Sequence, residues 1–368
     1  MIKVLYDHQI FSSQKAGGIS RYFCELLRKI ALDIDFDIEL SVIVSNNIYL
    51  KNYNVIRYID FFPKKDFKGK VRLMDYINRI KSIKKIKSKR YDIFHPTYYS
   101  PYFLKYLNNR PFVLTVYDMI HEKFRYLFPS KDKTSFYKKE LCMKASKIIA
   151  ISKNTKKDLI EIFGIDESKI EVVYLGSSIK KENKKRLSFA LPERYILFVG
   201  NRNGYKNFSN LVKAYSLLVK EYKEIELLCV GGGNFNAKEL KTFKKLNIEK
   251  RVHHLWVMDE YLSTIYENAL MFVFPSLYEG FGIPILEAFS CECPVVCSNT
   301  SSFPEIAKDA ALYFEPTNVE DIYDTMVKLL SDNELKKILI KKGKERLKYF
   351  SWEKTVDKTK NIYRQVLE

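Results

Sequence analysis

Short apolar runs alternate with longer amphipathic segments along this chain of 368 residues. The apolar runs are rich in Ile, Val and Phe, which is typical of strands buried on both faces of a parallel sheet. The amphipathic segments repeat apolar residues at three- and four-residue steps, as helices do. This alternation predicts an α/β fold in which helices cover both faces of parallel sheets. The strands are expected near residues 1–7, 92–95, 112–116, 147–151 and 170–174, and then near 196–199, 226–230, 271–274 and 294–297.

The predicted strands fall into two groups separated by a polar segment. Residues 177–188 are mostly charged or polar and indicate a linker. With 46% hydrophobic residues, a chain of this length can bury two cores. We therefore predict one domain at residues 1–178 and another at residues 179–350. Because ligands of parallel sheets bind at the carboxyl ends of the strands, the cleft between the domains is the expected site.

Two carboxylates lie eight positions apart across a Gly-Phe-Gly-Ile-Pro turn. The turn joins an apolar strand to a helical segment, and Pro284 suits the first turn of that helix. Gly280 and Gly282 can adopt backbone angles closed to other residues, and the N–H groups of the helix start can face an anion. Glu279 on the loop and Glu287 about one turn inside the helix can each accept hydrogen bonds from paired hydroxyls. The spacing predicts a sugar-nucleotide site.

The turn belongs to a longer pattern, Glu279-Gly-Phe-Gly-Ile-Pro-Ile-Leu-Glu-Ala288, which is followed by Cys293-Pro-Val-Val-Cys-Ser298. This pattern resembles the donor-site signature of glycosyltransferase family 4, whose members are retaining enzymes with the GT-B fold. The resemblance implies two Rossmann-like domains with parallel sheets facing across a cleft. It also implies that residues 351–368 form a C-terminal helix that packs back on the N-terminal domain. A retaining, metal-independent transfer from a nucleotide-diphosphate sugar is the implied activity.

The resemblance extends to two further loops. Gly17 and Gly18 open a helix, and in the family this loop lies beside the donor phosphates and the acceptor. Arg202 and Lys206 resemble the family's diphosphate clamp, which neutralises the leaving nucleoside diphosphate; the alternative is a solvated loop in a lysine-rich protein. The donor-binding residues implied by the resemblance are Gly17, Gly18, Arg202, Lys206, Glu279, Gly280, Phe281, Gly282, Ile283 and Glu287.

The strand at residues 112–116 is followed by a departure from the family pattern. Family members often carry a His-Asp pair here, with the histidine close to the transferred sugar. In this chain Tyr117 stands at the histidine position, Asp118 matches the aspartate, and His121 comes later. His121 either substitutes for the family histidine or packs locally. The candidate catalytic residues are therefore Glu279, Asp118, His121, Arg202 and Lys206.

The chemistry of glycosyl transfer requires groups that stabilise negative charge on the leaving phosphate. Preorganised cations and amides give the largest help to such a reaction. Because side chains can supply them here, we expect no metal and no other cofactor. Asp33-Ile-Asp35 has the spacing used by metal-dependent transferases of another fold, but it lies in an acidic connection and is expected to be solvated. Cys291, Cys293 and Cys297 lack a second ligand pair at zinc spacing.

Positive charge is concentrated in the first half of the chain. The formal net charge is +19, and residues 1–180 hold 34 Lys and Arg against 19 Asp and Glu. Much of the excess lies in residues 64–90, where apolar residues recur at helical spacing: Leu73, Ile77, Ile80, Ile83 and Ile86. This pattern indicates a basic amphipathic helix that either contacts an anionic membrane or packs as an ordinary core helix. Without a recognised binding motif, nucleic acid is not an expected partner.

Cysteine usage and hydropathy indicate where the protein works. The six cysteines lie mostly in predicted strands or helices rather than in a spaced disulfide framework. No signal peptide precedes the first strand, and no apolar run has the length of about 18 residues needed to span a bilayer. We expect a cytoplasmic protein, with peripheral contact on the inner leaflet of the cell membrane.

These observations favour a retaining hexosyltransferase that acts on a glycan or lipid-linked glycan in surface polysaccharide synthesis, such as O-antigen, lipopolysaccharide, capsule or exopolysaccharide. The segment Gly17-Gly-Ile-Ser-Arg-Tyr22 is similar to the start of polysaccharide mannosyltransferases in this family, which favours mannose. A noncatalytic GT-B paralogue that binds a nucleotide sugar or a partner protein is the alternative, and Tyr117 in place of histidine favours it. A GT-B epimerase or phosphorylase fits less well. The donor base and sugar, the acceptor, the linkage and the oligomeric state stay open.

Overall fold

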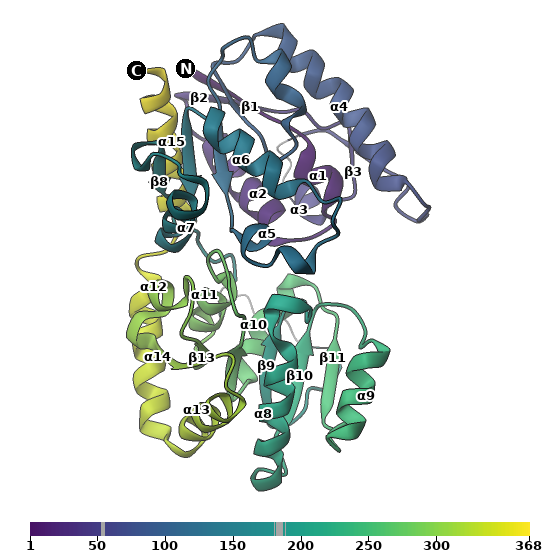
Figure 1. The fold of residues 1–368 in the computed structure, drawn as a ribbon, viewed down its shortest axis with the longest axis vertical. Coiled ribbons are helices and arrows are strands. Elements are labelled where there is room, and N and C mark those ends of the chain that lie inside the picture. The colour runs from purple at the N-terminus through teal and green to yellow at the C-terminus, as the bar shows by residue number, and fades with distance from the viewer. Residues whose placement is uncertain (53–55, 180, 182–186, 188) are drawn as a thin grey trace. The chain divides into compact units, whose positions relative to one another are not determined.

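A computed structural model describes residues 1–52, 56–179, 181, 187 and 189–368. The chain divides into two compact units (Figure 1). Unit 1 comprises residues 1–175 and 352–368, and unit 2 comprises residues 176–351. Each is an α/β body built on parallel strands, which confirms the predicted fold class. Most of the charged part of the predicted linker lies outside the described residues.

Unit 1 is built on two three-stranded parallel sheets that adjoin one another. Their strand orders are β2-β1-β5 and β6-β7-β8, and a parallel bridge between Phe94 and Phe112 joins them. A separate pair consists of β3 and β4. The strands are β1 (Ile2–Tyr6), β2 (Phe36–Leu40), β3 (Val44–Ser45), β4 (Ile59–Asp60), β5 (Ile93–His95), β6 (Val113–Val116), β7 (Lys147–Ala150) and β8 (Ile170–Val172).

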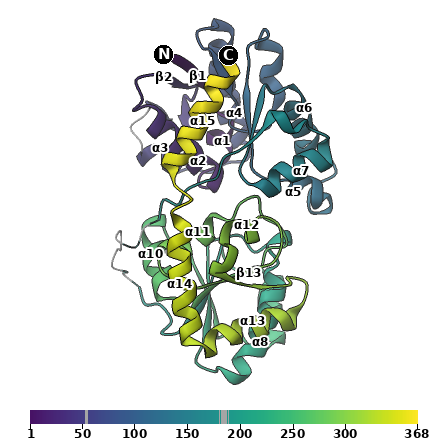
Figure 2. The ribbon, with the colours of Figure 1, turned by 90° about the vertical axis from the view of Figure 1, so that its left-hand side faces the viewer.

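The C-terminal helix α15 is part of the core of unit 1, where it packs beside α2 (Figure 2). The buried hydroxyl of Tyr363 lies 2.6 Å from the Tyr6 hydroxyl and 2.6 Å from His95 Nδ1. Burial lowers the pKa of His95 to about 3, so the ring is neutral. The helices of unit 1 are α1 (Gln9–Ser13), α2 (Gly18–Ile30), α3 (Ile48–Asn52), α4 (Lys70–Ser88), α5 (Ile120–Lys123), α6 (Thr134–Lys144), α7 (Lys153–Phe163) and α15 (Trp352–Leu367).

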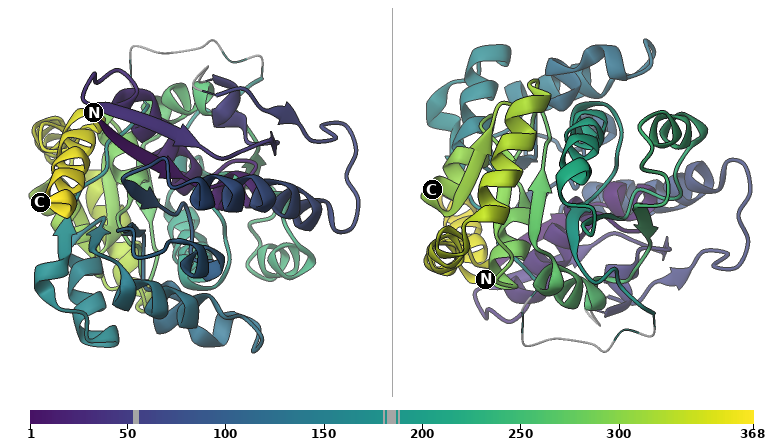
Figure 3. Two further views of the ribbon diagram at one scale, coloured as in Figure 1. Left: turned by 90° about the horizontal axis from the view of Figure 1, so that it is seen from above. Right: turned by 90° about the horizontal axis from the view of Figure 1, so that it is seen from below.

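Helix α4 does not bury the predicted apolar stripe as a whole, because its apolar side chains are divided between a buried face and an exposed face. The buried face carries Met74, Asn78, Ser82 and Ile86, two of them polar. The Asn78 side chain accepts from the backbone N–H groups of residues 43 and 44 at 2.7 and 3.0 Å, which anchors the helix through hydrogen bonds. Another face leaves apolar side chains exposed: Leu73 (43%), Tyr76 (62%) and Ile80 (54%). Figure 3 (left) shows α4, in blue, open to the viewer.

Unit 2 has one six-stranded parallel sheet in the order β11-β10-β9-β12-β13-β14. Strands β9 to β11 extend the sheet in one direction. The chain then crosses back to place β12 beside β9, and β13 and β14 extend the sheet in the other direction, as in dinucleotide-binding folds. The strands are β9 (Tyr195–Val199), β10 (Glu226–Val230), β11 (Val252–Leu255), β12 (Met271–Phe274), β13 (Val295–Ser298) and β14 (Ala311–Phe314). The helices are α8 (Phe208–Glu221), α9 (Ala237–Lys245), α10 (Asp259–Asn268), α11 (Ile283–Ser290), α12 (Phe303–Ala307), α13 (Val319–Ser331) and α14 (Asn333–Leu347).

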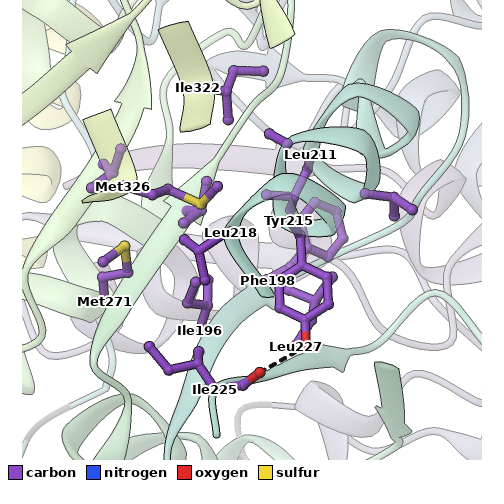
Figure 4. Close-up of a cluster of buried hydrophobic side chains, with 14 of the residues drawn as sticks. Ile196, Phe198, Leu211, Tyr215, Leu218, Ile225, Leu227, Met271, Ile322 and Met326 are labelled. Atoms are coloured by element: carbon purple, nitrogen blue, oxygen red, sulfur yellow. Dashed lines mark hydrogen bonds between the residues drawn. The ribbon is translucent and has the colours of Figure 1, made fainter. Parts of the chain in front are cut away.

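The core of unit 2 forms where α8 and α13 cover the sheet (Figure 4). Ile196 and Leu227 from adjacent strands pack with Leu211 and Leu218 of α8. The Tyr215 hydroxyl is also buried, and it donates to the carbonyl of residue 225 at 2.9 Å. This apolar layer fixes the strand ends from which the candidate site projects.

Candidate functional site

The candidate site in unit 2 lies at the switch point of the sheet, where β9 and β12 are neighbours. The loop after β9 holds Arg202 and Lys206, and the loop after β12 holds Glu279. The N–H of Leu277 donates to the carbonyl of Tyr205 at 2.7 Å and ties the two loops together. Loops that diverge from such a point form the crevice in which open α/β sheets bind ligands.

Lys206 and Glu279 form an ion pair across this switch point. Lys206 Nζ lies 2.5 Å from Glu279 Oε1, and both side chains are mostly shielded from solvent. Ser276 Oγ donates to the same carboxylate oxygen at 2.7 Å. An ammonium group has three N–H donors, so Lys206 can hold this carboxylate and still donate to a phosphate. The pair therefore fixes a cation at the switch point of the sheet.

Arg202 is held more tightly than the clamp pattern predicts. Its Nε donates to Glu239 Oε1 at 2.8 Å, and its Nη atoms donate to the carbonyls of Gly231, Gly233 and Asn234 at 2.7–3.0 Å. The guanidinium also lies 4.7 Å from the ring centre of Phe235. Four of the five N–H donors of the Arg202 guanidinium are therefore engaged within the protein. Arg202 thus shapes the glycine turn after β10 and presents little of its charge to a ligand.

The glycine turn needs glycine at its centre. Gly231, Gly232 and Gly233 all have positive φ angles. A Cβ atom at position 232 would lie 2.8 Å from the carbonyl oxygen of Gly200 and 3.0 Å from Arg202 Nη1. The turn after β10, the end of β9 and Arg202 therefore pack as one rigid element.

The turn after β12 places its residues as the motif predicts, with Glu287 inside α11. Gly282 has a φ of 104°, and a Cβ atom there would approach the Phe303 ring at 3.2 Å. Ile283 begins α11, and Phe281 is buried with its ring 5.8 Å from that of Phe350. The Glu287 carboxylate is buried and accepts from the Tyr266 hydroxyl at 3.1 Å. Burial, together with that carboxylate, raises the pKa of Tyr266 well above its ordinary value.

The candidate residues of unit 1 lie on the turn that follows β6. Asp118 Oδ1 accepts from the N–H of Ile120 at 3.0 Å and so starts the short helix α5. His121 on that helix stacks on Phe128 with ring centres 4.0 Å apart. Burial and the Lys138 cation lower the pKa of His121. His121 is thus kept neutral by its surroundings.

A fully buried lysine underlies this turn. Lys138 of α6 donates to the Asp118 carbonyl at 2.9 Å and to Glu122 Oε2 at 2.9 Å, and it lies 4.0 Å from Asp118 Oδ1. The Glu122 side chain is itself almost completely buried. Lys138 therefore connects the residues at both ends of the predicted catalytic turn.

The glycine pair of unit 1 begins α2. Gly17 is the N-terminal boundary residue of that helix, and Gly18 is its first residue. A Cβ atom at Gly17 would lie 2.6 Å from Gln14 Oε1, which accepts from the N–H of Ser20 at 3.3 Å. A side chain at Gly17 would displace Gln14 from the helix start.

The structure brings some predicted residues together and gives others unexpected partners. Lys206 meets Glu279, and Asp118 and His121 share one turn, whereas Arg202 pairs with a residue that the sequence analysis did not identify, Glu239. A signal for Glu239 exists in the Asn-x-x-Glu pattern of a capping box, which the structure contains at the start of α9. No comparable signal marks Lys138, because burial of a lysine depends on tertiary packing.

The described residues contain neither a cluster of metal-binding side chains nor a helix suited to span a membrane. Within residues 1–52, 56–179, 181, 187 and 189–368, no three His, Cys, Asp or Glu side chains are grouped so that they could hold a metal ion. Asp33 instead pairs with Lys360 at 2.8 Å, and this hydrogen bond lowers the pKa of Asp33. None of the helices in the same part of the chain combines the length and hydropathy needed to cross a bilayer.

Comparison with known families assigns both units. A family model described as Glycosyltransferase Family 4 matches residues 16–180, and one described as Glycosyl transferases group 1 matches residues 179–346. The chain belongs to glycosyltransferase family 4. The first matched region contains the Gly17–Gly18 pair, and the second contains the loops after β9 and β12.

Two individual relatives and one solved structure extend the comparison. The chain is 27% identical to O-antigen chain mannosyltransferase B of Escherichia coli, over 94% of this chain and 96% of that protein. It is 31% identical to a Campylobacter jejuni N-acetylgalactosaminyltransferase, named for a diphospho-undecaprenol-linked substrate, over 56% of this chain and 57% of that protein. The fold matches a sucrose-phosphate synthase from Thermosynechococcus elongatus with a TM-score of 0.77 and 19% identity, over 100% and 99% of the two chains.

Proposed function

We propose that this family 4 protein is a retaining hexosyltransferase that moves a sugar from a nucleotide diphosphate to a growing glycan in surface polysaccharide synthesis. The observation that carries the proposal is the Lys206–Glu279 pair, 2.5 Å apart at the switch point of a Rossmann-like sheet. In this proposal the ammonium group binds the leaving diphosphate, and Glu279 orients the ammonium and accepts from sugar hydroxyls.

The leaving group is the centre of the proposed mechanism. Cleavage of the anomeric C–O bond leaves an additional negative charge on the diphosphate, which preorganised donors stabilise. Lys206 supplies a cation, and the first N–H groups of α11, beside Gly282, add the positive end of a helix. In this proposal the carboxylate of Glu287 accepts from ribose hydroxyls. In the front-face reaction that we propose, the acceptor hydroxyl gives its proton to the departing phosphate oxygen.

We further propose mannose as the transferred sugar and a metal-independent reaction. The similarity to an O-antigen mannosyltransferase over nearly the whole chain supports the sugar. The ammonium group of Lys206 provides the positive charge that a metal ion provides in other transferases, which supports metal independence. No cofactor other than the donor substrate is part of the proposal.

We propose a lipid-linked glycan as acceptor and an anionic membrane surface on the cytoplasmic side as the place of reaction. The relative named for a diphospho-undecaprenol-linked substrate supports the acceptor class. The exposed Leu73, Tyr76 and Ile80 on α4 support membrane contact, because Lys84 and Lys87 continue the same helix. Apolar side chains can enter the interface while lysines meet anionic head groups.

The test of the proposed function is a panel of UDP-, GDP-, ADP- and dTDP-sugars. We would measure thermal stabilisation and release of nucleoside diphosphate, each with and without EDTA. Selective stabilisation by a GDP-sugar with EDTA-resistant turnover is expected. Stabilisation by no donor would favour the noncatalytic alternative, and turnover abolished by EDTA would overturn metal independence.

A further inference from the structure

A basic hollow opens on unit 1 close to the loop that carries the glycine pair. Its volume is about 460 Å³, and three segments line it: residues 12–15, residues 46–51 and residues 63–74. The first segment immediately precedes Gly17, and the last leads into α4. The hollow thus lies between the segment that leads to the glycine pair and the helix to which we assign membrane contact.

Hydrogen bonds fix the walls of the hollow. The Asn46 side chain donates to the Phe61 carbonyl at 2.7 Å and accepts from the Phe61 N–H at 3.1 Å. Lys70 Nζ donates to the carbonyls of Phe62 and Lys65 at 3.0 and 2.6 Å. The Asn47 side chain donates to the carbonyl of residue 14 at 2.8 Å and ties the first two segments together. The hollow is therefore a preorganised feature of the fold.

The lining of the hollow is strongly cationic. Asp66 is its one acidic lining residue, and five lysines surround it: Lys15, Lys51, Lys64, Lys65 and Lys70. Lys51 pairs with Asp60, outside the lining, at 2.9 Å. Within the described part of the chain, the ammonium groups of Lys15, Lys64 and Lys65 form no ion pair. Because like charges held together repel one another, a multiply charged anion would stabilise this arrangement.

Exposed aromatic side chains lie beside the cationic lining. Phe62 and Phe67 are both exposed, and their ring centres are 5.6 Å apart in an edge-to-face contact. The exposed Val71 continues this apolar surface onto α4, toward Leu73. A ligand that suits both surfaces has a compact anionic group joined to a hydrocarbon chain.

We propose that the hollow binds the diphosphate of a lipid-diphosphate-linked glycan, with the lipid chain lying over Phe62 and Phe67. The inference rests on the proposed function for its acceptor class and adds the place at which the acceptor is held. A diphosphate carries enough negative charge to match three unpaired ammonium groups. The glycan attached to it would then extend toward the Gly17 loop.

The test uses geranyl diphosphate as a soluble probe, with saturating GDP present to occupy the donor site. Isothermal titration compares the wild type, the variant Lys15→Ala/Lys64→Ala/Lys65→Ala, and a control with equal charge loss at exposed lysines of unit 2, Lys220→Ala/Lys241→Ala/Lys245→Ala. We expect the first variant to bind the probe at least tenfold more weakly and the control to match the wild type. Equal affinity of all three proteins would overturn the proposal.

Two further arms identify the ligand and separate the two proposals. Inorganic pyrophosphate and geraniol should each bind far more weakly than geranyl diphosphate, because each offers only one of the two contacts. Pyrophosphate binding as tight as that of geranyl diphosphate would show a free-anion site and overturn the lipid assignment. The variant Lys15→Ala/Lys64→Ala/Lys65→Ala should still be stabilised against thermal unfolding by the donor sugar. If the donor sugar stabilises none of the three proteins, not even the wild type, the transferase proposal fails and the proposal for the hollow is unaffected.

Discussion

The side chain of Arg202 donates from Nε to Glu239 Oε1 over 2.8 Å, and the other oxygen of the same carboxylate accepts from the N–H of Asn236 at 2.7 Å. One glutamate therefore holds both the arginine of the predicted clamp and the first turn of α9. We infer that Glu239 positions Arg202 against the glycine turn.

Replacement of Glu239 by alanine should loosen the glycine turn that Arg202 holds and so weaken donor binding by roughly tenfold, because the charge-assisted contact that orders Arg202 is lost. Isothermal titration with the nucleoside diphosphate that stabilises the protein measures this effect. Asn236→Ala is the matched control, because it removes the side-chain cap of α9 and leaves the bond to Arg202 intact. If both variants lose the same affinity, the helix cap is responsible and Arg202 is not.

The variants Lys206→Ala and Glu279→Ala should each reduce sugar transfer by more than about tenfold, as loss of a preorganised electrostatic contact does. Neither change should unfold the protein, since the pair lies on loops outside the core of unit 2. Initial rates of nucleoside diphosphate release would be measured beside thermal unfolding. Lys213→Ala, which removes an exposed lysine of α8, provides the control. Near-normal rates for both site variants would reject the proposed roles.

Replacement of Lys138 by methionine should lower the free energy of unfolding by about 3–5 kcal/mol, the range for removal of one member of a buried ion pair. The change leaves the Glu122 carboxylate buried without its cation. Adding Glu122→Gln should restore part of the loss, which a double-mutant cycle in urea would measure. Lys139→Met, at an exposed neighbouring position, should have little effect. If the two single variants lose free energies of unfolding that simply add in the double variant, Lys138 and Glu122 do not stabilise one another.

Binding to anionic vesicles should depend on the exposed side of α4. Tyr76→Ser/Ile80→Ser and Lys84→Glu/Lys87→Glu should each weaken co-sedimentation with phosphatidylglycerol vesicles, and salt should weaken it further. Lys81 and Lys85 are unsuitable for charge reversal, because Lys81 donates to the Val42 carbonyl at 2.9 Å and Lys85 pairs with a glutamate at 2.5 Å.

The matched control for vesicle binding is Ile338→Ser, which removes an exposed isoleucine from unit 2. This variant should bind vesicles as the wild type does. Undiminished binding by both α4 variants would exclude this helix as the membrane contact.

Acid should destabilise unit 1 in part through His95, whose pKa is lowered by burial to about 3. Above the ordinary pKa of about 6.5, the ring is neutral in both the folded and the unfolded state. Below that pH the unfolded state binds the proton first, so stability falls by about 1.4 kcal/mol per pH unit until the folded ring also titrates near pH 3.

The His95 contribution can be separated from that of other titrating groups. His95→Gln should unfold with a shallower dependence on pH between 6 and 4 than the wild type, whatever its stability at pH 7. Chemical unfolding at a series of pH values measures the slope. Identical slopes for the two proteins would contradict the assignment.

Much of the fold could be predicted from local patterns. The buried strands around Val116, Ile149 and Val273 are rich in Val, Ile, Leu and Phe, so short apolar runs mark them in the sequence. Strand β2 was missed because Phe36 and Leu40 enclose acidic residues, and the segment resembled a connection. Asp33 was expected to be solvated, yet it pairs with a lysine of α15, a contact over 327 positions that no local pattern contains.

Less of the candidate site could be predicted, because its details depend on tertiary partners. A motif in the sequence identifies Glu279 and Lys206. Their direct contact could not be predicted, because it depends on β9 and β12 being neighbours in the sheet. Arg202 was expected to face a ligand. Its guanidinium instead donates to carbonyls of the loop after β10, which the sequence pattern around Arg202 does not reveal. On α4, apolar spacing could not distinguish an exposed face from a buried one, since Asn78 and Ser82 take the buried positions.

The bond between Tyr6 and Tyr363 joins residues 357 positions apart. Unit 1 therefore cannot complete its core on the ribosome until the last helix has been synthesised, although most of its residues emerge first. Unit 2 is continuous in the sequence, from residue 176 to residue 351. Unit 2 can therefore complete its core before unit 1 does, although most of unit 1 is synthesised first.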